Sequence, residues 1–239
     1  MMIQIQVKHV LCLNEYLGKI KMKKKKVFIG ASILSTDFFD IQKTVKKINS
    51  SDLDFLHLDV MDGVFVPNIS FGPHFIKCLK NKCQKIFDVH LMVKNPLPYI
   101  GVFAEAGADI IMVHCEAKNA MKSLRLIKEA KLKCGIVINP DTSYKKIKKY
   151  MDIVDYIMVM TVYPGFGGQK FLDNQLDKIK KISLLIKNSG RKILLQVDGG
   201  VNFDNAEKLV QSGVNSLVVG SFLFNQKKFN ETVLEFKKL

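Results

Sequence analysis

The sequence predicts an α/β protein with a single domain, a (β/α)8 or TIM barrel, over residues 27–239. From Val27 onward, short apolar or β-branched runs alternate with longer amphipathic stretches, a pattern typical of repeated βα units. The alternation repeats eight times without an interval long enough for a second domain, and eight regular units favour a closed barrel over an open sheet. A chain of 239 residues with 48% hydrophobic content can bury the core of such a barrel.

The expected elements follow one another in a regular order. Strands are predicted near residues 27–34, 55–60, 85–91, 110–114, 133–138, 156–161, 192–197 and 216–219. Helices are predicted near residues 38–49, 73–79, 97–105, 121–130, 144–150, 172–188, 204–211 and 226–237. Residues that favour helix ends support these boundaries. Asp37, Pro73 and Asn202 stand at expected helix starts, and Gly190 and Gly213 follow later helices.

Residues 1–26 stand apart from this pattern. They lack its packing periodicity and end in four consecutive lysines, 23–26, directly before the first apolar strand. Neither this segment nor the stretch after Met22 has the hydrophobic core and small-residue cleavage site of a secretory signal. We interpret residues 1–26 as a dispensable tail, with Met22 as an alternative start of translation.

The net charge of +15 raises the question of a nucleic-acid partner. Arg125 and Arg191 are the only arginines, although arginine is preferred for bidentate contacts with phosphates and bases. The lysines recur on polar helix faces, as at Lys178 and Lys181, where they are typical of a solvated surface. We therefore expect no nucleic-acid partner, although a basic surface can attract an anionic ligand. No apolar stretch approaches the ~20 residues that span a bilayer, so no membrane association is expected.

Cysteine usage favours a reducing compartment. The cysteines are Cys12, Cys78, Cys83, Cys115 and Cys134, an odd number without a CxxC pair. A chain of this size does not need a disulfide framework to stabilise its core. We expect a cytoplasmic protein.

Polar side chains gather at the predicted strand ends, where barrels carry their catalytic residues. The strand-end groups are Ser32, His57, Asp59, His90, His114 and Asp198. Four of them form a set of two imidazoles and two carboxylates: His57, Asp59, His90 and Asp198. Such a set suits one divalent Zn²⁺, Fe²⁺, Mn²⁺ or Co²⁺ ion with positions left for a substrate. Nitrogen ligands argue against a dedicated Mg²⁺ site.

Glycine-rich segments follow the last three strands. They are Tyr163 to Gly168, Gly199–Gly200 and Gly220–Ser221. One such loop alone is weak evidence, because flexible turns use the same residues. Barrels often bind phosphate with the loops after strands 7 and 8, where free backbone N–H groups meet the anion. Three glycine sites in this order predict a phosphorylated substrate.

With these motifs assembled, the chain closely resembles the ribulose-phosphate 3-epimerase family of the ribulose-phosphate-binding barrel superfamily. The resemblance covers about residues 27–225. The matching stretches are 32–34, 56–63, 65–68, 71–73, 88–93, 160–162, 164–169, 196–200 and 220–221. Tyr163 departs from the Glu or Asn usual in the family at that position, although the motif around it is intact.

The resemblance implies roles for the matching residues. It implies a metal held by His57, Asp59, His90 and Asp198, with Asp59 and Asp198 also forming the acid/base pair. It implies substrate contacts from Ser32, His90, Gly165, Phe166, Gly167, Gly168, Gly199, Gly200, Gly220 and Ser221. It also implies that Met61, Met92 and Met160 line the site. Ordinary filling of the barrel explains these three methionines equally well.

The implied activity is the interconversion of D-ribulose 5-phosphate and D-xylulose 5-phosphate in the non-oxidative pentose phosphate pathway. Inversion at C3 needs proton removal on one face of the sugar and proton delivery on the other, and two carboxylates meet that need. A metal ion at the C2 oxygen would stabilise the enediolate. We expect one divalent metal ion, a small sugar-phosphate substrate and a homo-oligomer.

Other activities fit the sequence less well. Epimerisation of a six-carbon ketose phosphate such as allulose 6-phosphate needs the same catalytic residues and stays open. A non-catalytic nucleic-acid-binding role rests on net charge alone. A metal-free phosphosugar decarboxylase on the same scaffold is disfavoured by the pairing of His57 with His90.

Removal of residues 1–21 is expected to leave folding and activity intact, because the barrel pattern begins only at Val27. Thermal unfolding and the epimerase rate of the shortened chain, measured beside the full chain, check this. Loss of the folded state or of activity would contradict the interpretation of this segment as a tail.

Overall fold

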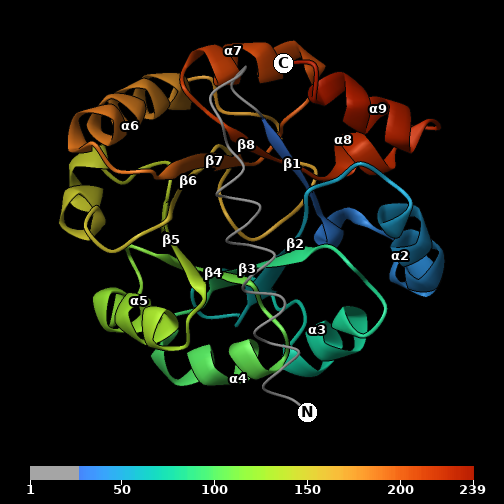
Figure 1. Ribbon diagram of the computed structural model, residues 1–239, viewed down its shortest axis with the longest axis horizontal. Helices are drawn as coiled ribbons and strands as arrows, with labels where there is room; N and C mark the ends of the chain where they lie inside the picture. Colours follow the sequence, from blue (N-terminus) through green and yellow to red (C-terminus); the bar gives the residue numbers. More distant parts are fainter. Residues whose placement is uncertain (1–26) are drawn as a thin grey trace.

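All the predicted strand segments form strands in the computed structural model, which describes residues 27–239. The strands are β1 (Phe28–Ser32), β2 (Phe55–Met61), β3 (Ile86–Met92), β4 (Ile110–His114), β5 (Lys133–Ile138), β6 (Tyr156–Met160), β7 (Leu194–Asp198) and β8 (Ser216–Val219). They are hydrogen-bonded in chain order, and β8 pairs in parallel with β1, which closes the sheet. The predicted (β/α)8 barrel is confirmed (Figure 1). The interpretation of residues 1–26 as a tail lies outside the described residues.

Helices surround the barrel on its outer side (Figure 1). The α-helices are α2 (Ile41–Asn49), α3 (Pro73–Lys80), α4 (Ile100–Glu105), α5 (Ala120–Glu129), α6 (Gln175–Ser189), α7 (Phe203–Gln211), α8 (Ser221–Phe224) and α9 (Phe229–Phe236). Shorter 3-10 turns are η1 (Ile33–Ser35), η2 (Phe38–Asp40), η3 (Leu97–Tyr99) and η4 (Tyr144–Tyr150). No helix within residues 27–239 has both the length and the apolar character needed to cross a membrane.

Several element boundaries differ from the prediction. The first strand ends at Ser32, because the chain turns into η1 at once, and β7 runs one residue further, to Asp198. The helix expected from residue 172 begins at Gln175, because the backbone N–H of Leu172 is bonded to the carbonyl of Thr161 (2.9 Å). The last predicted helix, 226–237, begins only at Phe229 as α9, and the short helix α8 before it was not predicted.

The residues predicted to mark helix ends act as caps. Asp37 accepts a hydrogen bond from the backbone N–H of Phe39, and Pro73 begins α3. Asn202 forms a reciprocal capping box with Asn205 at the start of α7. Gly190 ends α6 in the left-handed conformation that glycine adopts without steric cost. These local signals explain why the helix order was readable from the sequence.

Alternation along β2 divides its side chains between two environments. Leu56, Leu58 and Val60 pack outward into the main hydrophobic core between barrel and helices. His57 and Asp59 point into the barrel, as the period of two predicts. A separate apolar cluster of Phe28, Phe55 and Val218 packs with Ile86 and Leu194 inside the barrel. The Phe55 ring occupies the space that a Cβ on Gly30 would need, so a glycine is required there.

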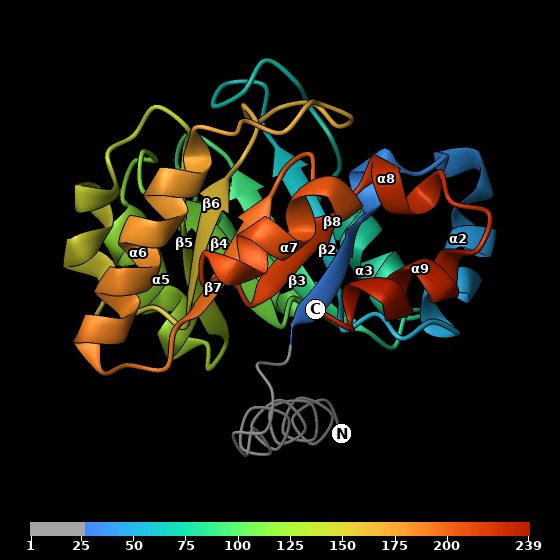
Figure 2. The ribbon, with the colours of Figure 1, turned by 90° about the horizontal axis from the view of Figure 1, so that it is seen from above.

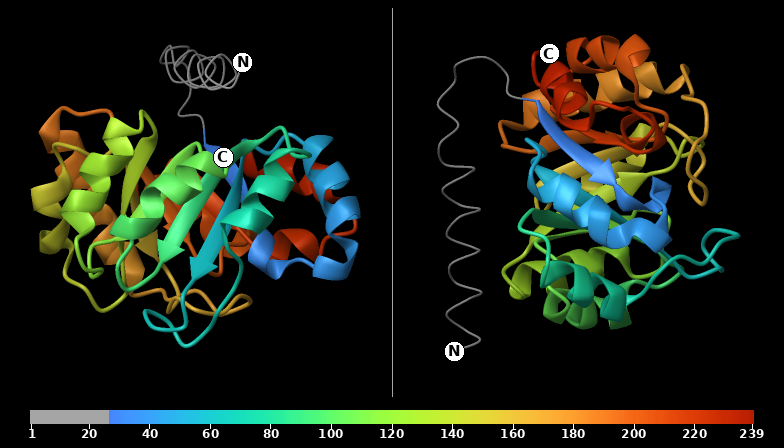
Figure 3. Two further views of the ribbon diagram at one scale, coloured as in Figure 1. Left: turned by 90° about the horizontal axis from the view of Figure 1, so that it is seen from below. Right: turned by 90° about the vertical axis from the view of Figure 1, so that its right-hand side faces the viewer.

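The loops after β2 and β6 project from the same end of the barrel, the end to which the strands point (Figures 2 and 3). The loops meet where the side-chain amide of Asn68 donates to the carbonyl oxygen of Gly165 (2.7 Å). In the β6 loop, the amide of Gln169 donates to the carbonyls of Tyr163 (2.6 Å) and Phe166 (2.8 Å). The barrel mouth is therefore bordered by two loops that are hydrogen-bonded to each other.

Candidate active site

Four side chains predicted as a group at the strand ends meet inside the barrel, where Asp198 ends its strand and the other three lie within theirs. His57 and Asp59 come from β2, His90 from β3 and Asp198 from β7. Parallel register places Asp59 beside His90, and barrel closure brings β7 to the same mouth. Each of the four offers one ligand atom, and these atoms all lie within 4.8 Å of one another.

The two shortest distances in this cluster join a histidine nitrogen to a carboxylate oxygen of Asp59. Asp59 Oδ1 lies 3.0 Å from His90 Nδ1 and 3.3 Å from His57 Nε2. Asp198 Oδ2 lies 3.7 Å from His57 Nε2 and 4.0 Å from His90 Nδ1. Both imidazoles are fully buried. The donor set therefore fits a small divalent cation, whose charge would offset two carboxylates crowded into a mostly buried cluster.

A chain of buried polar groups lies below His57. Its Nδ1 is 2.8 Å from Asp88 Oδ2, which also accepts from the amide of Gln196 (2.8 Å). Gln196 in turn accepts from the hydroxyl of Ser216 (2.9 Å). Because a carboxylate only accepts, Nδ1 of His57 donates, and Nε2 is the nitrogen that faces the cluster.

Asp88 and Gln196 were not predicted as site residues. Each stands two positions before a predicted site residue on the same strand, Asp88 before His90 and Gln196 before Asp198. Strand alternation therefore puts them on the barrel-facing side, and this signal was available in the sequence. Their place in the interior shows that the polar set extends a layer deeper than predicted.

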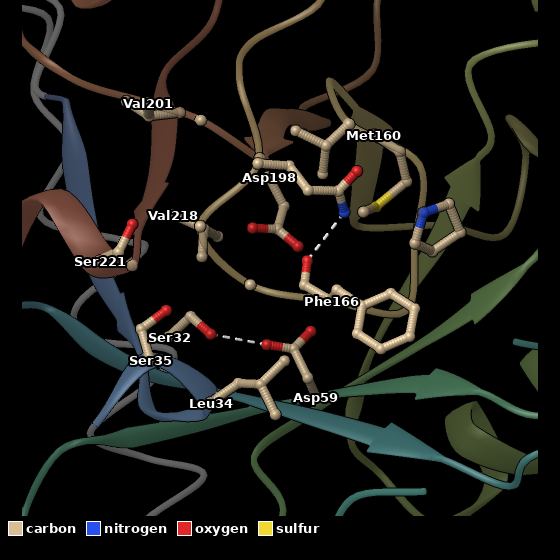
Figure 4. Close-up of a pocket in the computed structure, with 18 of the residues that line it drawn as sticks. Ser32, Leu34, Ser35, Asp59, Met160, Phe166, Asp198, Val201, Val218 and Ser221 are labelled. Carbon is tan, nitrogen blue, oxygen red and sulfur yellow. Dashed lines mark hydrogen bonds between the residues drawn. The ribbon is translucent and has the colours of Figure 1, made fainter. Parts of the chain in front are cut away.

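Ser32 ends β1 beside the catalytic candidates. Its hydroxyl donates to Asp59 Oδ2 at 2.6 Å (Figure 4). While Oδ2 is bonded to Ser32, the other carboxylate oxygen of Asp59, Oδ1, points toward the two imidazoles. Ser32 therefore orients the carboxylate in addition to lining the cavity where a substrate contact was predicted.

A cavity of about 250 Å³ opens above the cluster. Asp59 and Asp198 face each other across it (Figure 4). Its lining contains all the predicted substrate contacts except His90: Ser32, Gly165, Phe166, Gly167, Gly168, Gly199, Gly200, Gly220 and Ser221. Met61, Met92 and Met160 also line it. His57 and His90 lie beneath the cavity rather than in its wall.

Glycine is required where the chain passes close to other backbone. A Cβ on Gly199 would lie 2.8 Å from the backbone nitrogen of Val162, and one on Gly200 would lie 2.5 Å from that of Phe171. Both glycines also have positive φ angles, 119° and 66°. These glycines let the β7 loop pack against the β6 loop beside the cavity.

Ser35 is a third polar residue that was not predicted as part of the site. Its Oγ would lie 2.8 Å from a Cβ on Gly220 and 3.2 Å from one on Gly167. The hydroxyl therefore sits between two of the glycine segments in the cavity wall. Only its position three residues after Ser32 hinted at this role. Tyr163, the residue that departs from the family pattern, turns outward and donates to Asp141 Oδ1 (3.0 Å).

The two carboxylates have very different proton affinities. Burial alone would raise the pKa of Asp59, but the charge and the hydrogen bond of the His57 imidazole hold it well below its usual range. Burial, together with the negative charge of Asp59, raises the pKa of Asp198 to about 7. The pKa of His57 is raised by Asp59 and Asp88 despite its burial, and burial lowers that of His90 to about 4.

A closed (β/α)8 barrel with a polar cavity at the C-terminal ends of its strands defines the class of barrel enzymes. Within that class, residues 28–224 match the model of the Ribulose-phosphate 3 epimerase family. The chain belongs to that family, which confirms the resemblance seen in the sequence.

Individual relatives cover most of the chain. The ribulose-phosphate 3-epimerase of Bacillus subtilis is 41% identical over 211 residues, 87% of this chain and 97% of the relative. The chloroplastic ribulose-5-phosphate-3-epimerase of Arabidopsis thaliana is 37% identical over 220 residues, 91% and 78% of the two chains. Among solved structures, 3-hexulose-6-phosphate synthase from Salmonella typhimurium has a TM-score of 0.68 at 16% identity, covering 88% of this chain and 97% of that one. That likeness shows the shared fold.

Metal affinity is expected to rise with pH, because a bound metal must displace protons from the cluster. Asp198 carries a proton below its pKa of about 7, and His57 carries one to higher pH. For each group that must lose a proton, the Kd for the metal rises up to about tenfold with every pH unit by which the pH lies below the pKa of that group. The Kd for Zn²⁺, measured by chelator competition, should be more than about tenfold higher at pH 6 than at pH 7.5.

Asp198→Asn serves as the comparison for this measurement, because an amide has no proton to release at that position. Its pH dependence should be shallower than that of the wild type. Equal slopes for the two proteins would contradict the assignment of a titrating proton to Asp198.

Proposed function

We propose that this chain inverts C3 of a pentulose phosphate, interconverting D-ribulose 5-phosphate and D-xylulose 5-phosphate. The observation that carries the proposal is the pair of carboxylates, Asp59 and Asp198, facing each other across one cavity above two imidazoles. Membership of the epimerase family and the names of relatives such as that from Bacillus subtilis support it.

Inversion needs two proton-transfer groups on opposite sides of the reacting carbon. Asp59, with its lowered pKa, is ionised at neutral pH and suited to accept a proton. Asp198 faces the cavity from the other side, where it is suited to donate the second proton. Each transfer leaves the two groups in exchanged states, so the reverse reaction uses the same pair.

The donor set of His57, Asp59, His90 and Asp198 would hold one divalent ion, and we propose Zn²⁺, Fe²⁺, Mn²⁺ or Co²⁺. When bound, such an ion supplies Lewis-acid stabilisation of the oxyanion that develops at C2. Ser32 holds Asp59 in place through the hydrogen bond to Oδ2. His57 and His90 act here as ligands, because they lie beneath the cavity.

The cavity wall suits the rest of the substrate. We propose that the phosphate lies near the glycine segments 165–168, 199–200 and 220–221, whose lack of side chains leaves the backbone approachable. The thioether side chains of Met61, Met92 and Met160 line the cavity on the way to the carboxylates. An apolar wall there would exclude water from the reactive enediolate and limit side reactions.

We also propose that the enzyme acts in the cytoplasm, in the non-oxidative pentose phosphate pathway, and as a homo-oligomer. Cys83, Cys115 and Cys134 are free thiols in the protein interior, which fits a reducing compartment. The apolar side chains of Phe39 and Ile69 are exposed, 101% and 75%, which fits a surface covered by a second copy. Sedimentation of the purified protein tests the oligomeric state.

Removal of the metal is expected to abolish conversion of ribulose 5-phosphate to xylulose 5-phosphate. Dialysis against a chelator, followed by titration with Zn²⁺, Mn²⁺, Fe²⁺ or Co²⁺, should restore the rate at one ion per chain. Elemental analysis of the protein as purified identifies the native ion. The rate with allulose 6-phosphate, compared with the rate with ribulose 5-phosphate, measures whether the enzyme prefers a six-carbon or a five-carbon sugar. Full activity in metal-free protein would contradict the proposed cofactor.

Asp59→Asn and Asp198→Asn are each expected to abolish epimerisation and the exchange of the C3 proton with solvent, because each removes one of two essential proton carriers. A loss of about 10²- to 10⁴-fold in kcat is the usual effect of removing an acid/base group. Solvent deuterium incorporation and product formation are measured together. Asp204→Asn, on the surface of α7, is the matched control. Appreciable epimerisation by either active-site variant would contradict the two-base assignment.

A further inference from the structure

His114 is a strand-end histidine that the proposed reaction does not use. It ends β4 and is fully buried, with its Nε2 2.8 Å from Nε2 of His90. The two ring planes differ by 23° and the ring centroids are 5.0 Å apart. The rings therefore meet edge to edge through their nitrogens, and Nδ1 of His90 is left facing Asp59.

Glu116 lies on the far side of His114. Its Oε2 is 3.3 Å from His114 Nδ1, and its Oε1 accepts from the backbone N–H of Asn139 (3.1 Å). Burial would raise the pKa of Glu116, but hydrogen bonds with His114, Thr142 and Asn139 lower it to about 2. Glu116 is therefore a carboxylate at neutral pH, and a carboxylate only accepts hydrogen bonds.

The acceptor at Glu116 fixes the direction of the bonds that follow. Nδ1 of His114 must donate to Glu116, so Nε2 of a neutral His114 carries a lone pair. That lone pair accepts from Nε2 of His90 across the 2.8 Å contact. The His90 proton is then on Nε2, and Nδ1 has the lone pair that a metal ion requires.

We propose that His114 and Glu116 form a positioning relay that holds His90 with its proton on Nε2 and its Nδ1 lone pair toward the metal site. Within the cluster, Asp59 favours the opposite tautomer of His90. Asp59 Oδ1, 3.0 Å from Nδ1, would accept a proton from that nitrogen and stabilise the tautomer that cannot bind metal. The relay offsets this preference from the opposite edge of the ring.

The relay has a counterpart at the other imidazole. His57 is oriented directly by Asp88, whereas His90 is oriented by Glu116 through one intervening imidazole. The two histidines consequently present different nitrogens, Nε2 and Nδ1, which lie 3.4 Å apart. Because the relay acts on a metal ligand, the inference rests on the proposed metal-dependent function.

Three variants test the relay in the full chain. His114→Phe keeps a flat ring beside His90 and Phe65 but removes the acceptor. Glu116→Gln keeps size and removes the charge that fixes the direction. His114→Gln places an amide oxygen where Nε2 stood and should rescue the acceptor. Chelator competition with Zn²⁺ should give a Kd about 10- to 100-fold higher for His114→Phe. Glu116→Gln should show a smaller rise, and His114→Gln should recover most of the affinity.

Two further measurements separate positioning from general stability. The rise in Tm on adding Zn²⁺ should shrink in His114→Phe, because ligand stabilisation follows affinity. Val113→Ala, on the same strand with its side chain in the outer core, should lower Tm equally with and without metal. In protein from which the metal has been removed, long-range ¹⁵N–¹H spectra should show His90 protonated on Nε2 in the wild type. In His114→Phe the tautomer population should shift toward protonation on Nδ1.

The outcomes distinguish the relay from the function on which it rests. A wild-type chain that binds no Zn²⁺ overturns the metal site and the relay together. Tight binding by the wild type, with the same Kd and the same His90 tautomer in His114→Phe, overturns the relay alone. Failure of His114→Gln to bind better than His114→Phe also overturns it, because the acceptor would then have no role.

Discussion

The parallel register between β2 and β3 is the constraint on which the site depends. It sets Asp59 beside His90 and His57 beside Asp88, so ligand and supporting carboxylate alternate across one strand pair. Closure of the sheet through β1 and β8 then brings Asp198 to the same mouth. A shift of one residue in the register would turn this set of side chains out of the barrel, because side chains alternate between its two sides.

The barrel interior is layered by polarity. An apolar cluster that includes Phe28 and Phe55 fills part of it, and the chain of Ser216, Gln196 and Asp88 supports the imidazoles from below. Burying polar groups is costly unless they are hydrogen-bonded, and each of these side chains has a buried partner. Within this hydrogen-bonded group only Asp88 Oδ1 has no partner, and the Asp88 carboxylate lies beneath the proposed cation site. The polar layer thus orients the site and favours a cation above it.

The chemistry resides in the side chains rather than in the fold. The solved barrels that this chain resembles at 16% identity include 3-hexulose-6-phosphate synthase from Salmonella typhimurium and 3-keto-L-gulonate-6-phosphate decarboxylase from Vibrio cholerae. Those proteins are named for other activities, and their framework is closely similar. A barrel mouth accepts different reactions because the residues at its strand ends can change without altering the closed sheet. Here those residues are two carboxylates with separated pKa values over two imidazoles.

The sequence by itself determined the barrel and the residues at its mouth. The period of two along residues 55–61 fixed which side of the strand His57 and Asp59 occupy, and local caps such as Asn202 marked helix boundaries. Both signals are local, so a single sequence carries them. The family match then agreed with the resemblance that the same motifs had indicated.

Tertiary structure decided what depends on partners far apart in the chain. Gln196 meets Asp88 across 108 residues, and Asn68 meets Gly165 across 97. The nitrogen that each histidine presents depends on the carboxylate behind it, directly for His57 and through His114 for His90. Residue type and spacing give the strand face on which a side chain lies. The hydrogen bond that orients its ring arises only when the closed barrel brings the second partner into contact.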